Sequence, residues 1–390
     1  MKFNVVGHSF IGKSTGYYNL KKEALIGGGE VYLFDFAKFL QNEGHEVTII
    51  QARDKNEEFE FEGIKVKGFK PIVRLSGAKG IVERYGFFNM TWKNHLDKDV
   101  DRVHLHDFLH AFPRADRTMT GTCHGITWDN PNFVRNTRLG YQMRYYRKVI
   151  RPMAKFAVRR LKKVIANDTF LLRFVQSEMP QYRDKIDVIL NYVDIDKFNP
   201  ENKASVKKNY EGRKIILFPR NMGYGRGAIN SATAMIEVAK KHPEALLLMT
   251  GEGPEKPIVK EIIKKNKLEN NVHIIGHQDH FKDMPSLFAS ADIVIIPSTS
   301  TEGTSLSALE AMATGKPVIV SNIGGLPDIV INELNGLLVK PDADSLAEGI
   351  LRYLDDEGFA KRMATAGQAW VEKRHNYKLW CKKYKESLNI

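Results

Sequence analysis

The sequence has few cysteines and no long apolar run, and both absences narrow the class of protein. Its 390 residues contain two cysteines, Cys123 and Cys381, too few for a disulfide framework or a four-thiolate metal site. No apolar stretch approaches the roughly 18 residues that a membrane span needs. We predict a strand at Met1–Val6. We expect no signal peptide, because no long apolar stretch follows the charged residue Lys2. We therefore expect a reduced, cytoplasmic protein.

Length and composition indicate two folded domains. A chain of 390 residues is longer than the roughly 250–300 residues at which single cores stop growing. Hydrophobic residues make up 43% of the chain and charged residues 27%, which are ordinary proportions for a globular protein and argue against disorder, collagen and coiled coil. We predict a first domain at residues 1–195 and a second at 196–372. Residues 373–390 would form a helix that crosses back to the first domain.

The positive charge is concentrated in the first half. The formal net charge is +13, and residues 1–194 hold 32 Lys and Arg against 22 Asp and Glu. Residues 131–167 contain 11 Lys and Arg and no acidic residue. Six of these basic residues recur every three or four positions, as on one side of a helix: Arg144, Lys148, Arg151, Lys155, Arg159 and Lys162. Pro152 would kink this helix or start a second one.

Three interpretations of the basic segment 131–167 are open. It could be a core-packed helix with a solvated basic face. It could instead meet an anionic membrane surface or a phosphate-bearing acceptor, where each Lys or Arg adds about 1 kcal/mol, and the protein would then lie at the inner face of a membrane. Nucleic acid is the third interpretation. We expect no nucleic-acid partner, because no helix-turn-helix, zinc-finger or aromatic RNA-binding motif accompanies the charge.

Short β-rich runs alternate with helical patterns on both sides of a polar stretch at residues 199–213. The runs are Phe3–Val6, Val47–Gln51, Val103–His106, Met119–His124, Val164–Asn167, Val188–Asn191, Ile215–Pro219, Leu246–Thr250, Val272–Ile275, Ile293–Pro297 and Val318–Ser321. Such alternation is typical of parallel sheets with helices on both faces. We predict an α/β protein of two doubly wound, Rossmann-like domains that face each other across a cleft. Ligands of such sheets bind beyond the carboxyl ends of the strands.

A polar loop and the helix after it hold the strongest cluster of candidate site residues. A strand ends near Pro297, and the helix after the loop ends at Gly315. The first backbone amides of a helix point outward and bind anions such as a diphosphate. Here those amides belong to Thr304, Ser305 and Leu306. We predict that these three residues and Gly303 bind the diphosphate of a donor substrate.

Two glutamates flank this helix start. Glu302 lies in the loop just outside it, where a group attached to the phosphate would sit. Glu310 lies inside the helix, where its carboxylate could accept hydrogen bonds from vicinal hydroxyls such as those of a ribose. The alternative is that Glu302 stabilises the helix dipole and that Glu310 is merely solvated. Two acids around a phosphate-binding helix start indicate a site for a nucleotide–sugar diphosphate.

The spacing of the two glutamates resembles the signature of retaining glycosyltransferases of family 4 (glycosyl transferases group 1), which have the GT-B fold. Seven residues separate Glu302 from Glu310, and Gly303 follows the first of them. Three more segments resemble that family: 310–319 (EAMATGKPVI), 324–328 (GGLPD) and 335–339 (NGLLV). After the first Glu-Gly the family usually has Phe-Gly-Leu-Pro, whereas residues 304–307 of this chain are Thr-Ser-Leu-Ser.

The resemblance implies roles for residues outside this signature. It implies a basic pair that holds the donor's diphosphate, at Arg220 and at Arg226, where lysine is commoner in the family. It implies that His124 lies beside the donor sugar and the acceptor, and that Gly251 lies near the nucleotide base. The resemblance extends the role of His124 more weakly to Asp107. We expect Asp107 and Asp129 to contact the acceptor.

The glycine run before the first long helix is a further candidate for donor binding. Gly28 and Gly29 precede the predicted helix Val31–Asn42, and glycine lets a backbone approach a ligand closely. The dinucleotide fingerprint is not present, because no Gly-x-Gly-x-x-Gly follows the first strand. A flexible loop remains the alternative.

These patterns together predict a retaining, metal-independent glycosyltransferase. It would move a sugar from a nucleotide diphosphate sugar to a hydroxyl of a glycan or lipid-linked acceptor, with UDP as the favoured nucleotide and GDP as the alternative. The first domain would bind the acceptor and the second domain the nucleotide sugar. His124, Glu302, Arg220 and Arg226 would be its catalytic residues. We expect no cofactor and no metal, since His104 and His106 have no further ligand at a metal-binding spacing. The competing hypotheses are a nucleotide-sugar epimerase on the same architecture and a non-catalytic nucleotide-sugar-binding protein.

Overall fold

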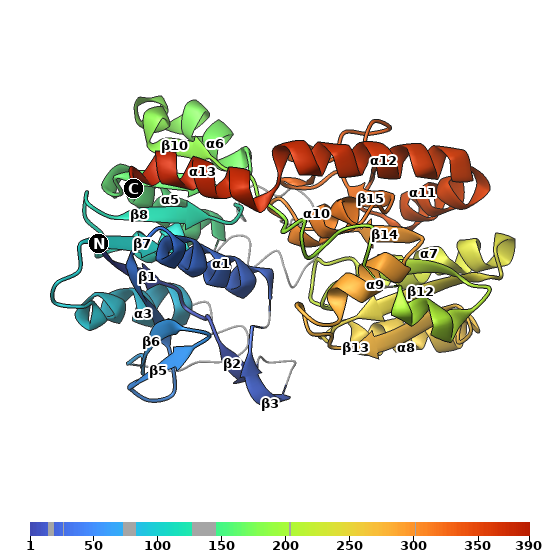
Figure 1. The fold of residues 1–390 in the computed structure, drawn as a ribbon, viewed down its shortest axis with the longest axis horizontal. Helices are drawn as coiled ribbons and strands as arrows, with labels where there is room; N and C mark the ends of the chain where they lie inside the picture. The colour runs from blue at the N-terminus through green and yellow to red at the C-terminus, as the bar shows by residue number, and fades with distance from the viewer. Residues whose placement is uncertain (15–18, 26, 73–82, 127–145, 203, 301) are drawn as a thin grey trace. The chain divides into compact units, whose positions relative to one another are not determined.

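Both series of strands form parallel sheets in the computed structural model (Figure 1). The structure describes residues 1–14, 19–25, 27–72, 83–126, 146–202, 204–300 and 302–390. They divide into two compact units: unit 1 comprises residues 1–189 and 384–390, and unit 2 comprises residues 190–383. Each unit has its own sheet with helices around it, which confirms the prediction of two α/β domains. The binding roles that the sequence assigns to the two domains stay predictions.

The sheet of unit 1 has the strand order β10-β9-β8-β7-β1-β4-β6-β5. Every neighbouring pair is parallel except β5 and β6, which are antiparallel. The strands are β1 (Lys2–Val6), β4 (Glu46–Ala52), β5 (Glu57–Phe61), β6 (Ile64–Phe69), β7 (Arg102–Leu105), β8 (Thr120–Cys123), β9 (Lys163–Ala166) and β10 (Ile186–Val188). A separate antiparallel pair joins β2 (Gly12–Ser14) to β3 (Asn19–Ala24). The prediction for the last strand, Val188–Asn191, was wrong, because β10 ends where its register partner Ala166 ends β9.

The sheet of unit 2 is parallel throughout, with the order β13-β12-β11-β14-β15-β16. Its strands are β11 (Lys214–Phe218), β12 (Ala245–Thr250), β13 (Val272–Gly276), β14 (Ile293–Ile296), β15 (Val318–Ser321) and β16 (Leu337–Val339). Five of them coincide with predicted runs, whereas the three-residue strand β16 was not predicted.

Alternate residues of the central strands of unit 2 belong to two separate hydrophobic clusters. Ile216 and Phe218 of β11 pack in one cluster with α7 (Ala228–Lys241) and α11 (Ala343–Asp355). Ile215 and Leu217 pack in the other with α9 (Met284–Ser290) and α10 (Leu306–Ala313). Because successive side chains of a strand point to opposite faces, both faces of this sheet are buried. This is the doubly wound arrangement that the alternation predicts.

The remaining helices complete the two units. Those of unit 1 are α1 (Gly28–Asn42), α3 (Phe88–Thr91), α5 (Arg151–Arg160) and α6 (Phe170–Glu178), and those of unit 2 are α8 (Lys256–Lys265) and α12 (Glu357–Arg374). Shorter 3₁₀ and π-helical turns lie at Glu83–Phe87, Trp92–His95, Phe108–Ala111, Tyr146–Ile150, Pro180–Lys185, Ser205–Tyr210 and Leu326–Asp328. Among the helices that the structure describes, none combines the length and the apolarity that crossing a membrane requires.

The last helix, α13 (Tyr377–Leu388), belongs to both units. Its first residues lie in unit 2, and from Tyr384 onward it packs in unit 1. There the ring of Tyr384 lies 5.2 Å from that of Phe36 on α1, between ring centroids. The backbone carbonyl of Leu388 accepts a hydrogen bond of 2.8 Å from Arg102 at the start of β7.

The basic segment forms a shorter helix than its charge pattern predicts. Pro152 lies in the first turn of α5, after the π-helical turn, and so starts a helix as expected. Two basic residues of the stripe, Arg151 and Lys155, form ion pairs with Glu178 of α6. Lys162 lies beyond the end of α5, so the predicted stripe is wrong at that position. Arg144 and residues 131–145 as a whole lie outside the described residues.

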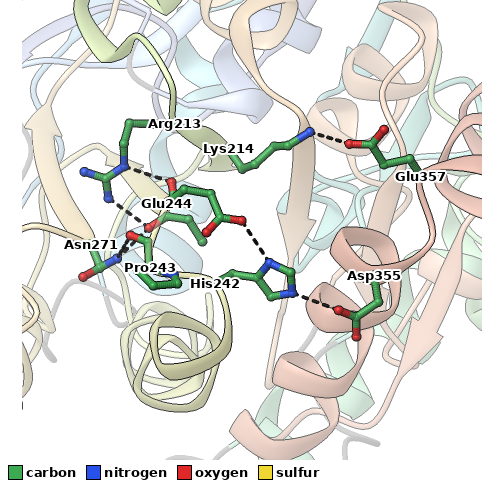
Figure 2. Close-up of polar contacts among 9 residues, drawn as sticks. Arg213, Lys214, His242, Pro243, Glu244, Asn271, Asp355 and Glu357 are labelled. Carbon is green, nitrogen blue, oxygen red and sulfur yellow. Dashed lines mark hydrogen bonds and ion pairs between the residues drawn. The ribbon is translucent and has the colours of Figure 1, made fainter.

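A cluster of ion pairs and hydrogen bonds joins elements at the amino ends of β11 and β12 (Figure 2). His242, just after α7, lies between Glu244 and Asp355, with nitrogen–oxygen distances of 3.0 and 2.9 Å. Lys214 pairs with Glu357 at 2.7 Å. Ligands of parallel sheets bind at the opposite, carboxyl ends of the strands, so we assign this cluster to stability.

Candidate functional site

The residues of unit 2 that the sequence predicts to be catalytic lie together at the carboxyl ends of neighbouring strands. Arg220 follows β11, and Ser298 and Glu302 follow β14, which pairs with β11 in the sheet. Arg226 lies in the same loop as Arg220, before α7. Parallel strands bring their carboxyl ends to one edge, which explains why these separate loops meet.

Glu302 accepts three hydrogen bonds through one carboxylate oxygen. Its Oε2 lies 2.7 Å from a nitrogen of Arg220, 2.7 Å from a nitrogen of Arg226 and 2.8 Å from the hydroxyl of Ser298. Arg220 also donates to that hydroxyl at 2.5 Å. Within the part of the chain that the structure describes, Oε1 of Glu302 accepts from no protein group. Oε2 therefore binds both arginines, and Oε1 can accept a hydrogen bond from a hydroxyl of a ligand.

The basic pair keeps Glu302 ionised. Burial alone would raise the pKa of this carboxyl, but the charges of Arg220 and Arg226 overcome that effect and lower its pKa to about 2. The side chains of Glu302 and Arg220 are 9% and 8% exposed, whereas that of Arg226 is 44% exposed. Two guanidinium groups share one carboxylate, so the cluster has an excess positive charge, and Arg226 is the group that solvent or a ligand anion can reach.

Two glycines permit the backbone to pass close to this cluster. Gly324 has a φ of +55°, and a Cβ there would lie 2.0 Å from the carbonyl oxygen of Glu302. Gly227 has a φ of +85°, and its Cβ would lie 1.9 Å from the carbonyl oxygen of Pro297. Any other residue would clash with these carbonyls, so the glycines fix the loops that carry Glu302 and Arg226.

The helix after Glu302 begins where the sequence predicts. Ser305 is the N-cap of α10, and no side chain caps the helix start. Thr304 before it accepts a hydrogen bond of 2.9 Å from the backbone N–H of Asn191 through its hydroxyl, and Gly303 connects it to Glu302. Within the described part of the chain, the first amides of α10, those of Leu306 and Ser307, have no side-chain acceptor.

Glu310 and Gly251 are positioned by packing. Glu310 is 5% exposed, and its Oε1 lies 3.8 Å from a ring nitrogen of His280, whose pKa is lowered to about 4 by burial. Gly251 follows β12 with a φ of +78°, and a Cβ there would lie 2.8 Å from the carbonyl oxygen of Arg220. Gly251 thus lets this loop pack against the loop of Arg220.

In unit 1 the structure surrounds His124 with polar groups that follow neighbouring strands. Its Nδ1 lies 2.9 Å from the side-chain amide of Asn167, which follows β9. Its Nε2 lies 3.3 Å from Nδ1 of His106, which follows β7. The ring of Tyr32 on α1 packs edge-on against it, with centroids 4.8 Å apart. Both ring nitrogens of His124 are therefore engaged within unit 1.

The carboxylate of Asp107 is engaged by its own neighbours. Oδ1 accepts from the backbone N–H of Leu109 at 3.0 Å, and Oδ2 accepts from Tyr85 at 2.9 Å and from Arg84 at 3.2 Å. These contacts hold the turn Phe108–Ala111. The acceptor role of Asp107 stays a prediction, and Asp129 lies outside the described residues.

Gly28 and Gly29 form the first turn of α1 and do not precede it. The prediction of a helix start at Val31 was wrong by three residues. A first helical turn needs no intrahelical partner for its amides, so glycines are tolerated there. The N-cap residue Gly27 has no side chain that could cap this helix start, and both glycines are exposed.

Sequence reasoning missed three residues that contact the candidate site groups. Ser298, His106 and Asn167 each lie within two positions after a strand, which is the signal that could have identified them. Among the described residues, no group of three His, Cys, Asp or Glu side chains is arranged as a metal site.

Two family models match the chain in succession. The model described as "Glycosyltransferase Family 4" matches residues 26–197, and the model described as "Glycosyl transferases group 1" matches residues 199–370. An uncharacterised glycosyltransferase of Methanocaldococcus jannaschii is 27% identical over 385 residues, which cover 94% of this chain and 94% of the relative.

Solved structures share the fold over nearly the whole chain. Sucrose-phosphate synthase of Thermosynechococcus elongatus has a TM-score of 0.78 at 19% identity, covering 99% of this chain and 97% of its own. Anabaena HepE, solved in complex with UDP and glucose, has a TM-score of 0.74 at 20% identity, covering 100% of this chain and 99% of its own. At these identities the likeness shows the fold alone.

Proposed function

Because the chain belongs to the family 4 glycosyltransferases of the GT-B fold, we propose that it transfers a sugar from a nucleotide diphosphate sugar to a hydroxyl, with retention at the anomeric carbon. We further propose that the acceptor is a glycan or a lipid-linked molecule. The observation that carries the proposal is the cluster of Glu302 with Arg220 and Arg226 beside the uncapped start of α10. UDP is the first nucleotide to test, since HepE is solved in complexes with UDP and UDP-glucose.

The positive groups of the cluster would act on the leaving diphosphate. The barrier to transfer lies in separating a positively charged sugar from a diphosphate that gains negative charge as it leaves. Arg226, which is half-exposed, can bind the diphosphate while Glu302 stays paired with Arg220. The amides at the start of α10 would add fixed dipoles of the same sign. One such group contributes about 3–4 kcal/mol where charge develops in a transition state.

The glutamates would orient the donor. Oε1 of Glu302 can accept a hydrogen bond from a hydroxyl of the sugar, because Arg220 and Arg226 both donate to Oε2. Glu310, which is buried on α10, would accept hydrogen bonds from the ribose hydroxyls. His124 and its neighbours in unit 1 would position the sugar and the acceptor. No side-chain nucleophile is required if the leaving phosphate itself takes the proton of the acceptor.

Glu302→Gln tests the site. Glutamine keeps the shape but removes the charge that orients Arg220 and Arg226, so we expect transfer to fall by about 10²–10³-fold. The measurement is release of the nucleoside diphosphate from a panel of UDP- and GDP-sugars, with and without acceptor. Circular dichroism spectra that match the wild type show that the variant is folded. Near-normal transfer by this variant would refute the assignment. Acceptor-independent conversion of the donor would favour the epimerase, and the anomeric configuration of the product tests retention.

We also propose that unit 1 meets an anionic membrane surface near the end of α5. Arg151 and Lys155 are paired with Glu178, but Arg159 and Arg160 are exposed. An aromatic pair lies beside them: Phe112, which is 38% exposed, packs on Phe156 with centroids 5.2 Å apart. Basic residues next to exposed aromatics are typical of surfaces that contact lipid headgroups.

Vesicle flotation tests this surface. Each basic residue adds about 1 kcal/mol to binding an anionic surface, so Arg159→Ser with Arg160→Ser should weaken binding to phosphatidylglycerol vesicles by roughly tenfold or more. Lys382→Ser with Lys383→Ser removes the same charge from two exposed positions of unit 2 and serves as the control. Equal binding to phosphatidylcholine and phosphatidylglycerol vesicles would remove the electrostatic argument.

A further inference from the structure

Residues 191–193 and 375–377 of unit 2 are hydrogen-bonded to each other, although they lie far apart in the sequence. The backbone N–H of Val193 donates to the carbonyl of His375 at 2.8 Å. The carbonyl of Val193 accepts from the backbone N–H of Tyr377 at 3.1 Å, and the pairing is an isolated parallel β-bridge. We call these two stretches the paired segments.

Asn191, in the first of the paired segments, makes two hydrogen bonds to Thr304, the residue before the N-cap of α10. Its backbone N–H donates to the hydroxyl of Thr304 at 2.9 Å, and its side-chain amide donates to the backbone carbonyl of Thr304. Thr304 is 1% exposed. Asn191 thus fixes both the side chain and the carbonyl of the residue that leads into the helix.

The bond to the carbonyl of Thr304 determines the direction of the next N–H. This carbonyl and the N–H of Ser305 belong to one planar peptide unit, and in a trans peptide they point in opposite directions. Since the carbonyl is directed at Asn191, the N–H of Ser305 is directed away from it. Among the residues that the structure describes, this N–H has no hydrogen-bond acceptor, although Ser305 is only 5% exposed. A buried N–H without a partner is costly, so it indicates a place for a ligand oxygen.

His375 holds Asn191 in turn. Nδ1 of His375 lies 3.1 Å from the backbone carbonyl oxygen of Asn191. Burial lowers the pKa of His375, so at neutral pH its ring is neutral and carries one proton. A carbonyl oxygen can only accept, so this proton lies on Nδ1. Hydrogen bonds are therefore donated by His375 to Asn191 and by Asn191 to Thr304.

We propose that Asn191 and His375 are positioning residues for diphosphate binding. Through Thr304 they direct the N–H of Ser305 at a phosphate oxygen that binds at the start of α10. This inference rests on the proposed function, and all of its residues belong to unit 2. The sequence predicts a role in donor binding for Thr304 and Ser305, but none for Asn191 or His375.

Asn191→Ala tests the positioning role. Alanine keeps the backbone N–H but removes the amide that orients the carbonyl of Thr304. We therefore expect UDP binding to weaken by about tenfold or more, the effect of losing a hydrogen bond to a charged group. Uridine has no phosphate, so its binding should not change.

Calorimetric titration measures the binding of UDP to the wild type and to Asn191→Ala, and competition with UDP measures the binding of uridine. GDP and guanosine take their place if UDP does not bind. Unchanged binding of the nucleoside diphosphate would overturn the proposal. An equal loss for the nucleoside would overturn it too, because the substitution would then disturb more than the phosphate contact.

His375→Asn and His375→Phe test the second positioning residue. Asparagine places an amide N–H near Nδ1 and should restore UDP binding, whereas phenylalanine keeps a ring without a donor and should weaken UDP binding by about tenfold. Combining His375→Phe with Asn191→Ala should add little, because both changes act on one peptide. Equal UDP binding by the two His375 variants would contradict the proposal, and this pair decides the matter if Asn191→Ala does not fold.

The protonation of His375 can be measured without any ligand. Nitrogen-15 chemical shifts of labelled histidine should show that Nδ1 of His375 carries the proton at neutral pH. A proton on Nε2 alone would mean that His375 does not donate to Asn191, and His375 would lose its part in the proposal.

Asn376→Ala is the matched control for a general loosening of the paired segments. The side chain of Asn376 donates to the carbonyl of Glu372 at 2.7 Å and accepts from the N–H of Leu379 at 2.8 Å. Both contacts are local to the end of α12 and the start of α13, so their loss should lower the melting temperature but leave UDP binding unchanged. If Asn376→Ala weakens UDP binding as much as Asn191→Ala does, the assignment to Asn191 is wrong.

The failure of this inference differs from the failure of the proposed function. If Asn191→Ala binds the nucleoside diphosphate and transfers sugar like the wild type while Glu302→Gln does not transfer, the inference is wrong and the proposed function stands. If the wild type binds neither UDP nor GDP, the proposed function fails and this inference fails with it.

Discussion

At the scale of single residues, the two arginines of the cluster differ in burial and should differ in what they do. Arg226 is half-exposed, so Arg226→Met should leave the fold intact and lower kcat by about 10²–10³-fold. Arg220 is buried against Glu302, so Arg220→Met leaves a carboxylate without its buried partner. It should lower the free energy of unfolding by about 3–5 kcal/mol.

Thermal unfolding and initial rates measured on both variants check this contrast. Arg226→Lys provides an intermediate, since a lysine keeps the charge but loses the second hydrogen bond of a guanidinium. Equal destabilisation by Arg220→Met and Arg226→Met would mean that burial does not separate the two residues.

Single residues also show what sequence patterns can predict about a site. Glu302, Arg220 and Arg226 are charged and lie at recognisable spacings, and the structure brings these three together. The contacts of Ser298 with Arg220 and of Asn167 with His124 were not predicted, because these residues become neighbours only through the lateral order of strands. That order, β11 beside β14 and β8 beside β9, leaves no local signal in the sequence.

At the scale of elements, the His242 cluster predicts a pH dependence of the stability of unit 2 (Figure 2). Hydrogen bonds to Glu244 and then Asp355 raise the pKa of His242 despite partial burial. Because the pKa of His242 is higher in the folded than in the unfolded state, its protonation stabilises the folded state. This contribution is complete below the unfolded-state pKa of about 6.5 and is lost as the pH rises through the folded-state pKa. Since Asp355 is exposed, the effect should be small, about 1–3 °C in melting temperature.

Differential scanning calorimetry of the wild type and His242→Gln from pH 5.5 to 9 measures this contribution. The advantage of the wild type should be largest at the acid end and should vanish at the alkaline end. In a background carrying Glu244→Gln and Asp355→Asn the pH trend should be absent. A difference between wild type and His242→Gln that does not change with pH would contradict the assignment.

Elements were predicted well where burial is two-sided and poorly where it is not. The central strands β11 and β12 are buried on both faces and appear in the sequence as apolar runs. Strand β5 (Glu57–Phe61) is an edge strand with alternating charged residues, and β16 has three residues, so neither resembles a buried run. The start of α1 was missed because exposed glycines lack the apolar periodicity of the rest of the helix.

At the scale of the whole molecule, the end of α13 contributes to the interior of unit 1. Tyr384 is fully buried and lies against Tyr32 and Thr122, so deleting residues 384–390 removes a large aromatic side chain and the hydroxyl that these two residues contact. Loss of a buried aromatic typically lowers the free energy of unfolding by about 3–5 kcal/mol. We expect unit 1 to become sensitive to proteolysis and to unfold at lower temperature.

Limited proteolysis and calorimetry of the truncated chain measure that loss. Deletion of residues 389–390 alone keeps Tyr384 and Leu388 and should behave as the wild type. Tyr384→Phe keeps the ring and removes one hydroxyl, so its effect should be intermediate, about 1–2 kcal/mol. If the deletion of residues 384–390 leaves unit 1 as stable as before, the helix end is only an attachment.

The path of α13 has a practical consequence for expressing the units separately. A gene fragment that stops at Ile189 lacks the peptide that fills the space against Phe36 and Phe39, and would expose aromatic surface. A fragment spanning 190–390 would carry that same peptide with nothing to cover it. A faithful isolated version of unit 1 would need residues 384–390 rejoined through a linker, or a circular permutant that places them ahead of Met1.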